Sequence, residues 1–248
     1  MKDFIAPQDQ ALLQRHGLAD FESLWALELA PVDAPNTARG GWSSVYRLQL
    51  DEAAFYLKRQ SNYLTRSLRR PLGEPTFARE FRNIERYRSL AIPALQAAFF
   101  GERRINGEQR AVLLTRALDD WQDLDYWLQG WPQHSGALRE AILKACGELA
   151  ARLHLAGQVH GCFYPKHIFL RQQGEHFEAC LIDLEKTRPA WLGQRDRVRD
   201  LEPLLRRATI WCDQEVRQFL TAYLARQADV AQWFEQLTQR RRNKENRA

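Results

Sequence analysis

Residues 160–186 read HGCFYPKHIFLRQQGEHFEACLIDLEK, and this stretch decides the fold class. Its apolar runs predict two short strands at 167–171 and 177–183, joined by a turn at Gln173-Gly174. The second run stays apolar up to Asp183, which ends it. A carboxylate at the end of a core strand is costly unless a cation or a donor binds it. Asp183 is therefore a candidate site residue.

The residues before this stretch predict mainly strands and one long helix. Phe77, Phe81 and Ile84 recur at helical spacing after Pro75, which indicates an amphipathic helix that ends before Pro93. The expected strands are 24–29, 45–50, 53–58, 97–100 and 111–114, with hairpin turns at Asp51-Glu52 and Asn106-Gly107.

From residue 123 the pattern becomes helical. Apolar residues recur every three or four positions from Leu138 to Leu153, Gly157 supplies a C-terminal cap, and the chain is helical again from Asp200 onward. The change falls near 115–120, so we expect an α+β fold of two lobes with a cleft between them. The expected parts are an N-lobe of residues 1–117, a C-lobe of residues 118–238 and a basic tail of residues 239–248.

The composition is that of an ordinary globular protein. Of the 248 residues, 45% are hydrophobic and 27% charged, which excludes disordered, collagen-like and disulfide-scaffold classes. No CxxC pair occurs among Cys146, Cys162, Cys180 and Cys212, so we expect reduced thiols, no zinc site and a cytoplasmic location. We see no signal peptide and no apolar stretch long enough to span a membrane.

The net charge of +5 is concentrated in the tail. Residues 239–248 carry one acid and five bases, Arg240, Arg241, Arg242, Lys244 and Arg247, which give +4 and leave about +1 for the rest. A nearly neutral body argues against dedicated nucleic-acid binding. The tail is interpreted either as a solvated helix end or as an electrostatic handle for anionic lipid, lipopolysaccharide or nucleic acid.

Five features follow one another in a fixed order. They are a Gly40-Gly41-x-Ser43 turn, Lys58 on the following strand, Glu80 on the long helix, a loop from His160 to His167, and Asp183. Each alone has an ordinary reading: a hairpin turn, an edge-strand lysine, a solvated helix residue or a satisfied loop histidine. Together, in this order, they are typical of a protein-kinase-type phosphotransferase.

The chemistry of phosphoryl transfer explains these residue types. Small residues let backbone N–H groups approach phosphates closely. A strand lysine such as Lys58 neutralises phosphate charge, and a helix glutamate such as Glu80 holds that lysine in place. A carboxylate such as that of Asp183 holds Mg²⁺, a hard cation that takes oxygen ligands and bridges phosphate oxygens.

The motifs at 160–170 and 181–186 closely resemble those of the bacterial lipopolysaccharide core kinase family. Thr76-Phe77-x-Arg79-Glu80-Phe81 and Asp200-Leu201 are similar to the pattern of the same family. The likeness covers about residues 39–224 and is closest to the InaA-type branch. It implies a eukaryotic-kinase-like fold and ATP- and Mg²⁺-dependent phosphorylation of a sugar hydroxyl in the lipopolysaccharide core.

The resemblance also implies a role for each candidate residue. Lys58 and Glu80 form an ion pair, His167 and Asp183 hold Mg²⁺, and Asp200 braces the catalytic loop from a neighbouring helix. The residues that lie over the phosphates of ATP are Gly40, Gly41, Ser43 and Val45.

The chain departs from the family pattern at Cys162. Active members carry the catalytic aspartate there, and Gly161 and Tyr164 replace the usual arginine and lysine. Loss of a general base lowers a rate by about 10²–10⁴-fold. Phosphoryl transfer nevertheless depends mainly on positioning and charge stabilisation, so activity is weakened rather than excluded.

Other residues of the loop are candidates for the missing groups. Lys166 is a candidate for the lost positive charge, and Glu185 for orienting the acceptor hydroxyl. Cys162 itself is interpreted as a small buried thiol, with a nucleophile beside His160 as the alternative.

Residues 58–70 contain five bases and no acid, and are interpreted either as a solvated loop or as a surface that attracts an acidic glycolipid. With the basic tail, this surface would seat the protein peripherally on the inner leaflet of the inner membrane.

Three functions stay open at this point. The first is an ATP- and Mg²⁺-dependent kinase of lipopolysaccharide core sugars. The second is a pseudokinase or nucleotide-binding scaffold in envelope stress, inactive because Cys162 replaces the aspartate. The third is a kinase of small molecules of the aminoglycoside or choline type.

Overall fold

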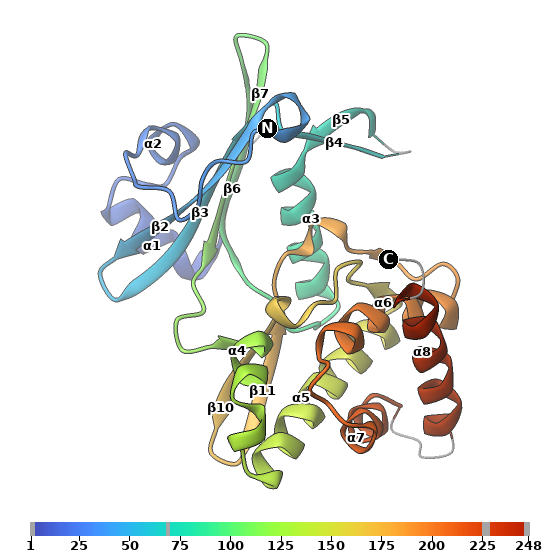
Figure 1. The fold of residues 1–248 in the computed structure, drawn as a ribbon. Coiled ribbons are helices and arrows are strands. Elements are labelled where there is room, and N and C mark those ends of the chain that lie inside the picture. Colours follow the sequence, from blue (N-terminus) through green and yellow to red (C-terminus); the bar gives the residue numbers. More distant parts are fainter. Residues whose placement is uncertain (1–2, 68–69, 225–228, 246–248) are drawn as a thin grey trace. The chain divides into compact units, whose positions relative to one another are not determined.

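The computed structural model describes residues 3–67, 70–224 and 229–245. Its internal contacts divide the chain into two compact units. The first unit runs to Arg86 and resumes over Leu95–Asp119, and the second comprises Tyr87–Ala94 and the chain from Asp120 onward. The long helix α3 (Thr76–Ser89) therefore begins in the first unit and ends in the second (Figure 1).

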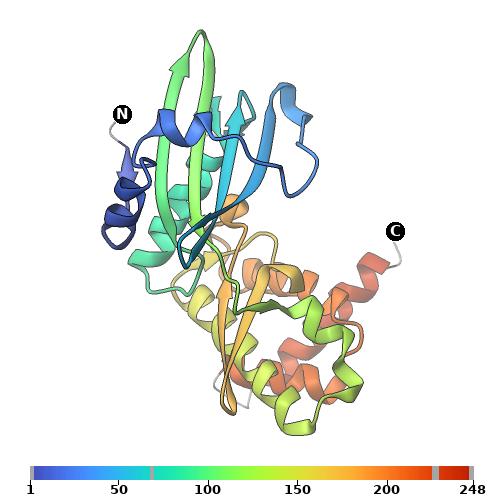
Figure 2. The ribbon, with the colours of Figure 1, turned by 90° about the vertical axis from the view of Figure 1, so that its left-hand side faces the viewer.

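A five-stranded antiparallel sheet forms the centre of the first unit (Figure 2). Its strands, in spatial order, are β1 (Phe4–Ile5), β6 (Ala97–Ile105), β7 (Glu108–Arg116), β3 (Ala53–Ser61) and β2 (Trp42–Leu50). The β2–β3 and β6–β7 hairpins confirm four predicted strands and both predicted turns. Asp51 and Asn106 take the left-handed backbone conformation that such tight turns require.

Helices cover both faces of this sheet in Figure 1. Helices α1 (Pro7–Arg15) and α2 (Phe21–Ala26) bury Leu13 and Phe21 against Phe55 on one face. Helix α3 lies on the other face, where the ring of Phe81 stacks on that of Phe100 with centroids 4.4 Å apart. The predicted amphipathic helix after Pro75 is thus confirmed.

The predicted strand at 24–29 is wrong, because these residues begin inside helix α2. The carboxylate of Asp20 caps that helix and accepts the backbone N–H of Ser23 at 2.8 Å. The segment that follows makes two isolated bridges to β2, at Tyr46 and Ser43. The glycine turn, which contains the 3-10 turn η1 (Ala38–Gly40), therefore joins β2 to an irregular segment and not to a second strand.

A hairpin that the sequence did not predict follows β3. It consists of β4 (Leu64–Ser67) and β5 (Arg70–Pro75) and occupies part of the basic stretch interpreted as a loop. Arg69, one of the five bases of that stretch, lies outside the described residues.

The second unit is mainly helical. Its helices are α4 (Leu124–Gln129), α5 (Gly136–Leu155), α6 (Gln194–Arg207), α7 (Asp213–Leu224) and α8 (Val230–Glu245). Its 3-10 turns are η2 (Trp131–Gln133), η3 (Pro165–His167) and η4 (Leu184–Lys186). No described helix is long and apolar enough to cross a membrane.

Helix α5 is the predicted helix of the second half. Ser135 caps it by accepting the N–H of Leu138, and Gly157 follows its end with φ near +69°. Gly147 lets α7 approach closely, since a Cβ there would lie 2.6 Å from the carbonyl oxygen of Phe219. This close contact joins α5 and α7 into the core of the unit.

The predicted hairpin near residue 174 is confirmed with shifted ends. Its strands are β10 (Ile168–Gln173) and β11 (His176–Leu181), β8 (Gln122–Asp123) adds a third strand, and β9 (Gln158–Val159) pairs with β12 (Arg188–Pro189). Asp183 was expected to end the second strand. It lies two residues beyond Leu181, in a left-handed conformation with φ of 58°, and so leaves the direction of the strand.

Candidate functional site

The predicted site residues fall into two groups, one in each compact unit. Lys58, Glu80 and the glycine turn belong to the first unit, whereas the loop 160–167 and Asp183 belong to the second.

Lys58 and Glu80 form a buried ion pair. The Nζ atom of Lys58 donates to Oε1 of Glu80 at 2.6 Å, and the two side chains are 17% and 5% exposed. Nζ also lies 5.9 Å from the centroid of the Phe77 ring. Separating this ammonium group from its partner costs much free energy, because an unpaired buried charge is strongly destabilising. The pair therefore fixes a positive charge on β3.

Gln60 holds the helix that carries Glu80. It lies two residues after Lys58 on β3 and is fully buried. Its Oε1 accepts the hydroxyl of Thr76 at 2.7 Å and the N–H of Phe77 at 2.8 Å, which satisfies the first turn of α3. Sequence reasoning missed this residue, because a lone glutamine among polar neighbours gives no signal.

Close packing explains the glycine turn without any ligand. A Cβ on Gly41 would lie 2.3 Å from the carbonyl oxygen of Ser61, so no other residue fits against the end of β3. Gly40 has φ of +75°. Ser43 exchanges backbone hydrogen bonds with Asn36, and Val45 lies opposite Lys58 in the β2–β3 register.

In the second unit, Asp200 anchors the start of the loop from its position on α6. Its carboxylate accepts the N–H of His160 at 2.8 Å and that of Gly161 at 2.7 Å. The imidazole of His154 lies 3.2 Å from the same carboxylate, and the hydroxyl of Tyr223 lies 2.8 Å from the other ring nitrogen. Asp200, His154, His160 and Tyr223 are buried, and the carboxylate braces the start of the loop as predicted.

Both ring nitrogens of His160 are engaged with the backbone. Nε2 donates to the carbonyl of Ile182 at 2.9 Å, since a carbonyl can only accept. Nδ1 lies 3.3 Å from the N–H of Cys162 and accepts it. His160 thus joins the loop to the residue before Asp183.

His167 faces Asp183 across 3.4 Å, measured from Nε2 to Oδ2. Nδ1 of His167 donates to the carbonyl of Cys162 at 2.8 Å, and this contact assigns the ring proton to Nδ1. Burial lowers the pKa of His167, so the neutral ring presents a lone pair at Nε2. Two electron-pair donors, an imidazole nitrogen and a carboxylate oxygen, therefore face one another.

This pair fits a metal ion that arrives with other ligands. Asp183 is a hard oxygen ligand of the kind Mg²⁺ prefers, while an imidazole nitrogen is a softer one. Within the described residues no group of three or more His, Cys, Asp and Glu side chains is placed to hold a metal. At phosphate-transfer sites Mg²⁺ takes one or two carboxylates and completes its shell with water and phosphate oxygens. The two residues match that requirement.

The thiol of Cys162 is buried and lies beside Lys186. A hydrogen bond to this thiol raises the pKa of Lys186, whose charge also interacts with Glu185 and Asp183. Gly161 makes the approach possible, because a Cβ there would lie 2.7 Å from the carbonyl oxygen of Lys186. The cation next to position 162 therefore comes from Lys186, which sequence reasoning missed.

Three results of the comparison with known proteins bear on the family and the fold. A family model described as "Lipopolysaccharide kinase (Kdo/WaaP) family" matches residues 22–223. Protein InaA of Escherichia coli (strain K12) is 32% identical over 174 residues, which span 68% of this chain and 79% of that protein. The solved structure of WaaP in complex with acyl carrier protein is 21% identical, with a TM-score of 0.70 over 97% of this chain and 99% of that chain.

This chain belongs to the lipopolysaccharide kinase (Kdo/WaaP) family. The resemblance drawn from its motifs is confirmed, and the structural similarity to WaaP confirms the kinase-like α+β fold.

Two further residues of the loop, Lys166 and Tyr164, interact with side chains outside the loop. Lys166 is exposed, and its charge acts on the carboxyl of Asp125. The ring of Tyr164 is covered by the guanidinium of Arg207, with Cζ 3.9 Å from the ring centroid. Lys166 stays a candidate for the lost positive charge, and Lys186 is the lysine that lies beside Cys162.

The basic stretch 58–70 is not a continuous positive surface. Lys58 is paired with Glu80, and the buried guanidinium of Arg59 donates to the carbonyls of Trp25 and Leu27 at the end of α2. Arg66 is exposed, and Arg70 lies 3.9 Å from Glu74. Internal contacts thus take two of the bases that the sequence offered to an acidic ligand.

Proposed function

We propose that this member of the lipopolysaccharide kinase family is an ATP- and Mg²⁺-dependent phosphotransferase that acts on a sugar hydroxyl of the lipopolysaccharide core. The observation that carries the proposal is the buried Lys58–Glu80 ion pair, with its 2.6 Å contact. A buried lysine held by a glutamate is the arrangement that kinases use to bind ATP phosphates. Desolvation of the two charges is costly, and a lysine that binds phosphate oxygens gives the pair a function.

Each of the two groups of candidate residues has a task in this proposal. In the first unit, Lys58 neutralises phosphate charge while Glu80 fixes the direction of its ammonium group. The turn before β2 and the start of that strand face the phosphates through Gly40, Gly41, Ser43 and Val45. In the second unit, Asp183 and the lone pair of His167 hold Mg²⁺, which would supply charge neutralisation at the phosphate oxygens.

The loop residues hold and orient rather than transfer protons. His160 has no free ring nitrogen, so we assign it a positioning role. Position 162 carries a thiol where active family members carry a carboxylate, so we assign no general base to it. Lys186 brings a positive charge to this place and stabilises charge on the transferred group. Lys166 and Glu185 stay as candidates for contacts with the acceptor.

Calorimetric titration of ATP into the full chain, with and without Mg²⁺, tests the proposal. We expect metal-dependent binding that Lys58→Met and Asp183→Asn each weaken at least about tenfold. Lys144→Met is the matched control, since Lys144 is an exposed lysine on α5 and its loss changes no proposed contact. Absence of binding by the native chain, or equal binding by both site variants, overturns the proposal.

A second candidate is a kinase-shaped scaffold that binds nucleotide without transferring phosphate. It is favoured by Cys162, which occupies the position of the base while the Asp200 network around it is complete. The two candidates differ in one result: the scaffold binds Mg²⁺·ATP yet phosphorylates no core oligosaccharide, even in the Cys162→Asp variant.

A further inference from the structure

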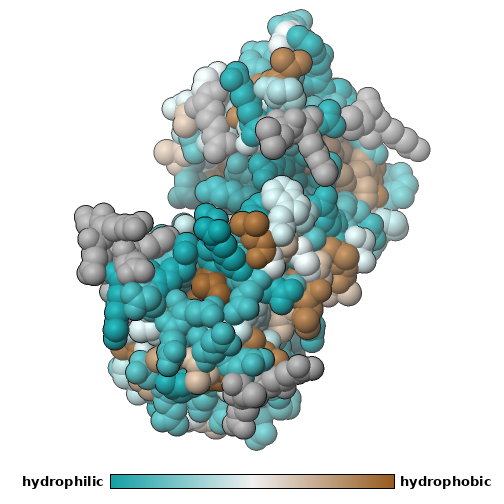
Figure 3. Space-filling view, turned by 90° about the vertical axis from the view of Figure 1, so that its right-hand side faces the viewer, coloured by the Kyte–Doolittle hydropathy of each residue, from teal (hydrophilic) through white to brown (hydrophobic). Residues whose placement is uncertain are grey.

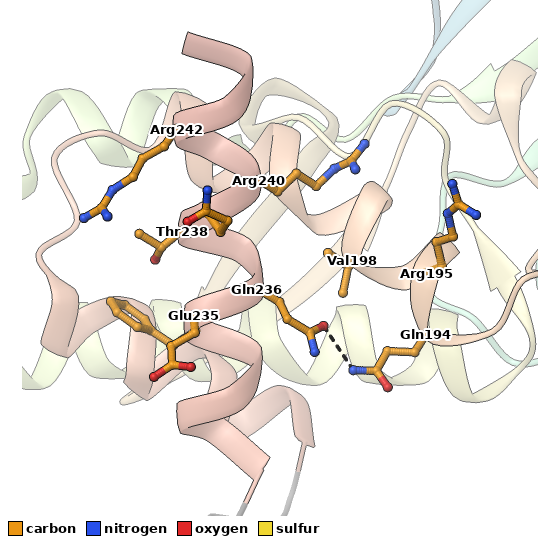
Figure 4. Close-up of a pocket in the computed structure, with 10 residues that line it drawn as sticks. Gln194, Arg195, Val198, Glu235, Gln236, Thr238, Arg240 and Arg242 are labelled. Atoms are coloured by element: carbon orange, nitrogen blue, oxygen red, sulfur yellow. Dashed lines mark hydrogen bonds between the residues drawn. The ribbon is translucent and has the colours of Figure 1, made fainter. Parts of the chain in front are cut away.

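A groove in the second unit has an arginine-rich lining that the proposed chemistry does not use. It lies between α6 and α8 and encloses about 1180 Å³. Figure 4 shows Arg195 from α6 and Arg240 from α8 with their guanidinium groups extended toward the same side, whereas Arg242 points away from α6. Gln194 and Gln236 join the two helices across the groove by a 3.2 Å hydrogen bond.

Arg195 and Arg240 have no acidic partner among the described residues. Neither guanidinium forms an ion pair or a hydrogen bond there, and Nε of Arg240 is buried without an acceptor. One acid, Glu235, lines the groove together with three arginines, so the lining has a net positive charge. Two like charges on the same side favour an anion between them.

A pair of exposed apolar residues comes just before α6, one of the two helices that line this groove. Trp191 and Leu192 precede the first residue of α6 by three and two positions, and they are 73% and 55% exposed. Figure 3 shows the side of the molecule that lies on the right in Figure 1, where hydrophobic side chains interrupt a largely hydrophilic surface. Adjacent exposed apolar side chains mark an interaction site more often than isolated ones do.

The backbone beneath this pair is firmly held. The buried carboxylate of Asp196 accepts the N–H of Leu192 at 3.0 Å and pairs with both terminal nitrogens of Arg188. The guanidinium of Arg188 lies 5.6 Å from the ring centroid of Trp191. Buried hydrogen bonds therefore fix the backbone that carries these two exposed apolar side chains.

We propose that Trp191, Leu192, Arg195 and Arg240 form a docking surface for an anionic lipid bilayer. Tryptophan and leucine insert at the boundary between headgroups and acyl chains, and tryptophan is enriched at that depth. Arginines next to them meet lipid phosphates, and each basic residue at an anionic surface strengthens binding about fivefold. A membrane offers both an apolar layer and many phosphates at one surface, which matches the two parts of this surface.

This proposal is independent of phosphate transfer, because it concerns binding alone. Sedimentation of the full chain with vesicles tests it. We expect the native chain to bind vesicles of equal parts phosphatidylglycerol and phosphatidylethanolamine, and not vesicles of phosphatidylcholine, and to be released by high salt.

Two double variants separate the contributions. Trp191→Ser with Leu192→Ser removes the apolar part without touching a buried side chain, and Arg195→Gln with Arg240→Gln is expected to weaken vesicle binding about 25-fold. Thermal unfolding verifies that each variant is folded. The matched controls are Leu72→Ser, which removes a side chain 90% exposed on β5, and Arg104→Gln, which neutralises an exposed arginine on β6.

The vesicle-binding results either support or overturn the proposal. Weaker binding by both double variants with unchanged binding by both controls supports the proposal. Equal loss in Leu72→Ser moves the contact to the β4–β5 hairpin and overturns it. Failure of the native chain to bind anionic vesicles also overturns it, and leaves an acidic protein as the occupant of the groove.

Discussion

The two groups of candidate residues, one in each compact unit, differ in what they retain. In the first unit the charged pair is complete: Lys58 contacts Glu80, and Gln60 holds the helix that carries the glutamate. In the second unit the supporting framework is complete, because Asp200 holds the loop at two backbone N–H groups. The position at its centre nevertheless carries the buried thiol of Cys162 in place of a carboxylate.

The hydrogen bonds that shape the loop are independent of the side chain that would carry out catalysis. The hydrogen bonds that shape the loop run through the backbone of residues 160 and 161, so they do not depend on the side chain at position 162. A catalytic side chain can therefore be exchanged while its surroundings persist. Four substitutions test this difference between the two units, and the largest effect is expected at position 162 itself.

Cys162→Asp restores a carboxylate within the intact framework, next to the positive charge of Lys186. We expect phosphate transfer to a core oligosaccharide to increase by about 10²–10⁴-fold, the usual contribution of a general base. The measurement is the initial rate with labelled ATP, and Cys162→Asn is the control of equal size without a base. If the aspartate variant binds Mg²⁺·ATP and gains no rate on a verified acceptor, the loop does not work as a kinase loop.

Asp200→Asn tests the framework. The buried carboxylate accepts the N–H groups of His160 and Gly161, so replacing it leaves donors without a full partner. We expect the free energy of unfolding to fall by about 3–5 kcal/mol, as for other broken buried charge contacts. Urea denaturation measures this, with the exposed Asp120→Asn as control. An equal effect of the two variants would mean that the network around Asp200 does not stabilise the loop.

Asp196→Asn tests the segment that follows Asp183. Hydrogen bonds from Arg188 lower the pKa of Asp196 from 3.8 to about 2, so its stabilising effect is present above about pH 4 and disappears as the pH falls toward 2. We expect the variant to be less stable by about 2–3 kcal/mol at neutral pH. The difference from the native chain should shrink in acid. Denaturation curves between neutral pH and about pH 2 measure this stability difference. A difference that is constant with pH contradicts the stabilising role of the Asp196 carboxylate.

Gly161→Ala probes the contact between the loop and Lys186. An alanine there meets both a φ of +80° and a carbonyl oxygen 2.7 Å away, for a cost of about 2–3 kcal/mol. The matched control is Gly174→Ala, where φ is +62° and no atom lies within 4 Å, so that about 1 kcal/mol is expected. Equal unfolding free energies for the two variants would mean that the loop moves away from Lys186 without cost.

Much of the fold could be predicted because its signals are local. Turn residues such as Asp51-Glu52 and Asn106-Gly107 mark the hairpins, and apolar spacing marks α3 and α5. The miss at residues 24–29 has a local reason as well: the cap from Asp20 outweighs the strand preference of the residues after it. The β4–β5 hairpin was missed because its residues show no apolar alternation and β5 contains two prolines and a glycine.

The candidate site divides in the same way. Lys58, Glu80, His167 and Asp183 stood out from the sequence, and the structure brings the members of each pair into contact, while their roles stay predictions. The partners of the loop did not stand out. The choice of Lys166 followed sequence distance, whereas Lys186 reaches Cys162 because η4 packs on Gly161.

The order of most elements, the family and the residues able to carry charge could be predicted from the sequence. These follow from residue type and short-range spacing, which act within one helix, strand or turn. The pairing of buried polar groups depends on the folded chain: Gln60 with the start of α3, Asp200 with the loop, and Asp196 with Arg188. The reason is that a buried donor or acceptor must find a partner wherever the fold provides one, and that partner is often distant in the chain.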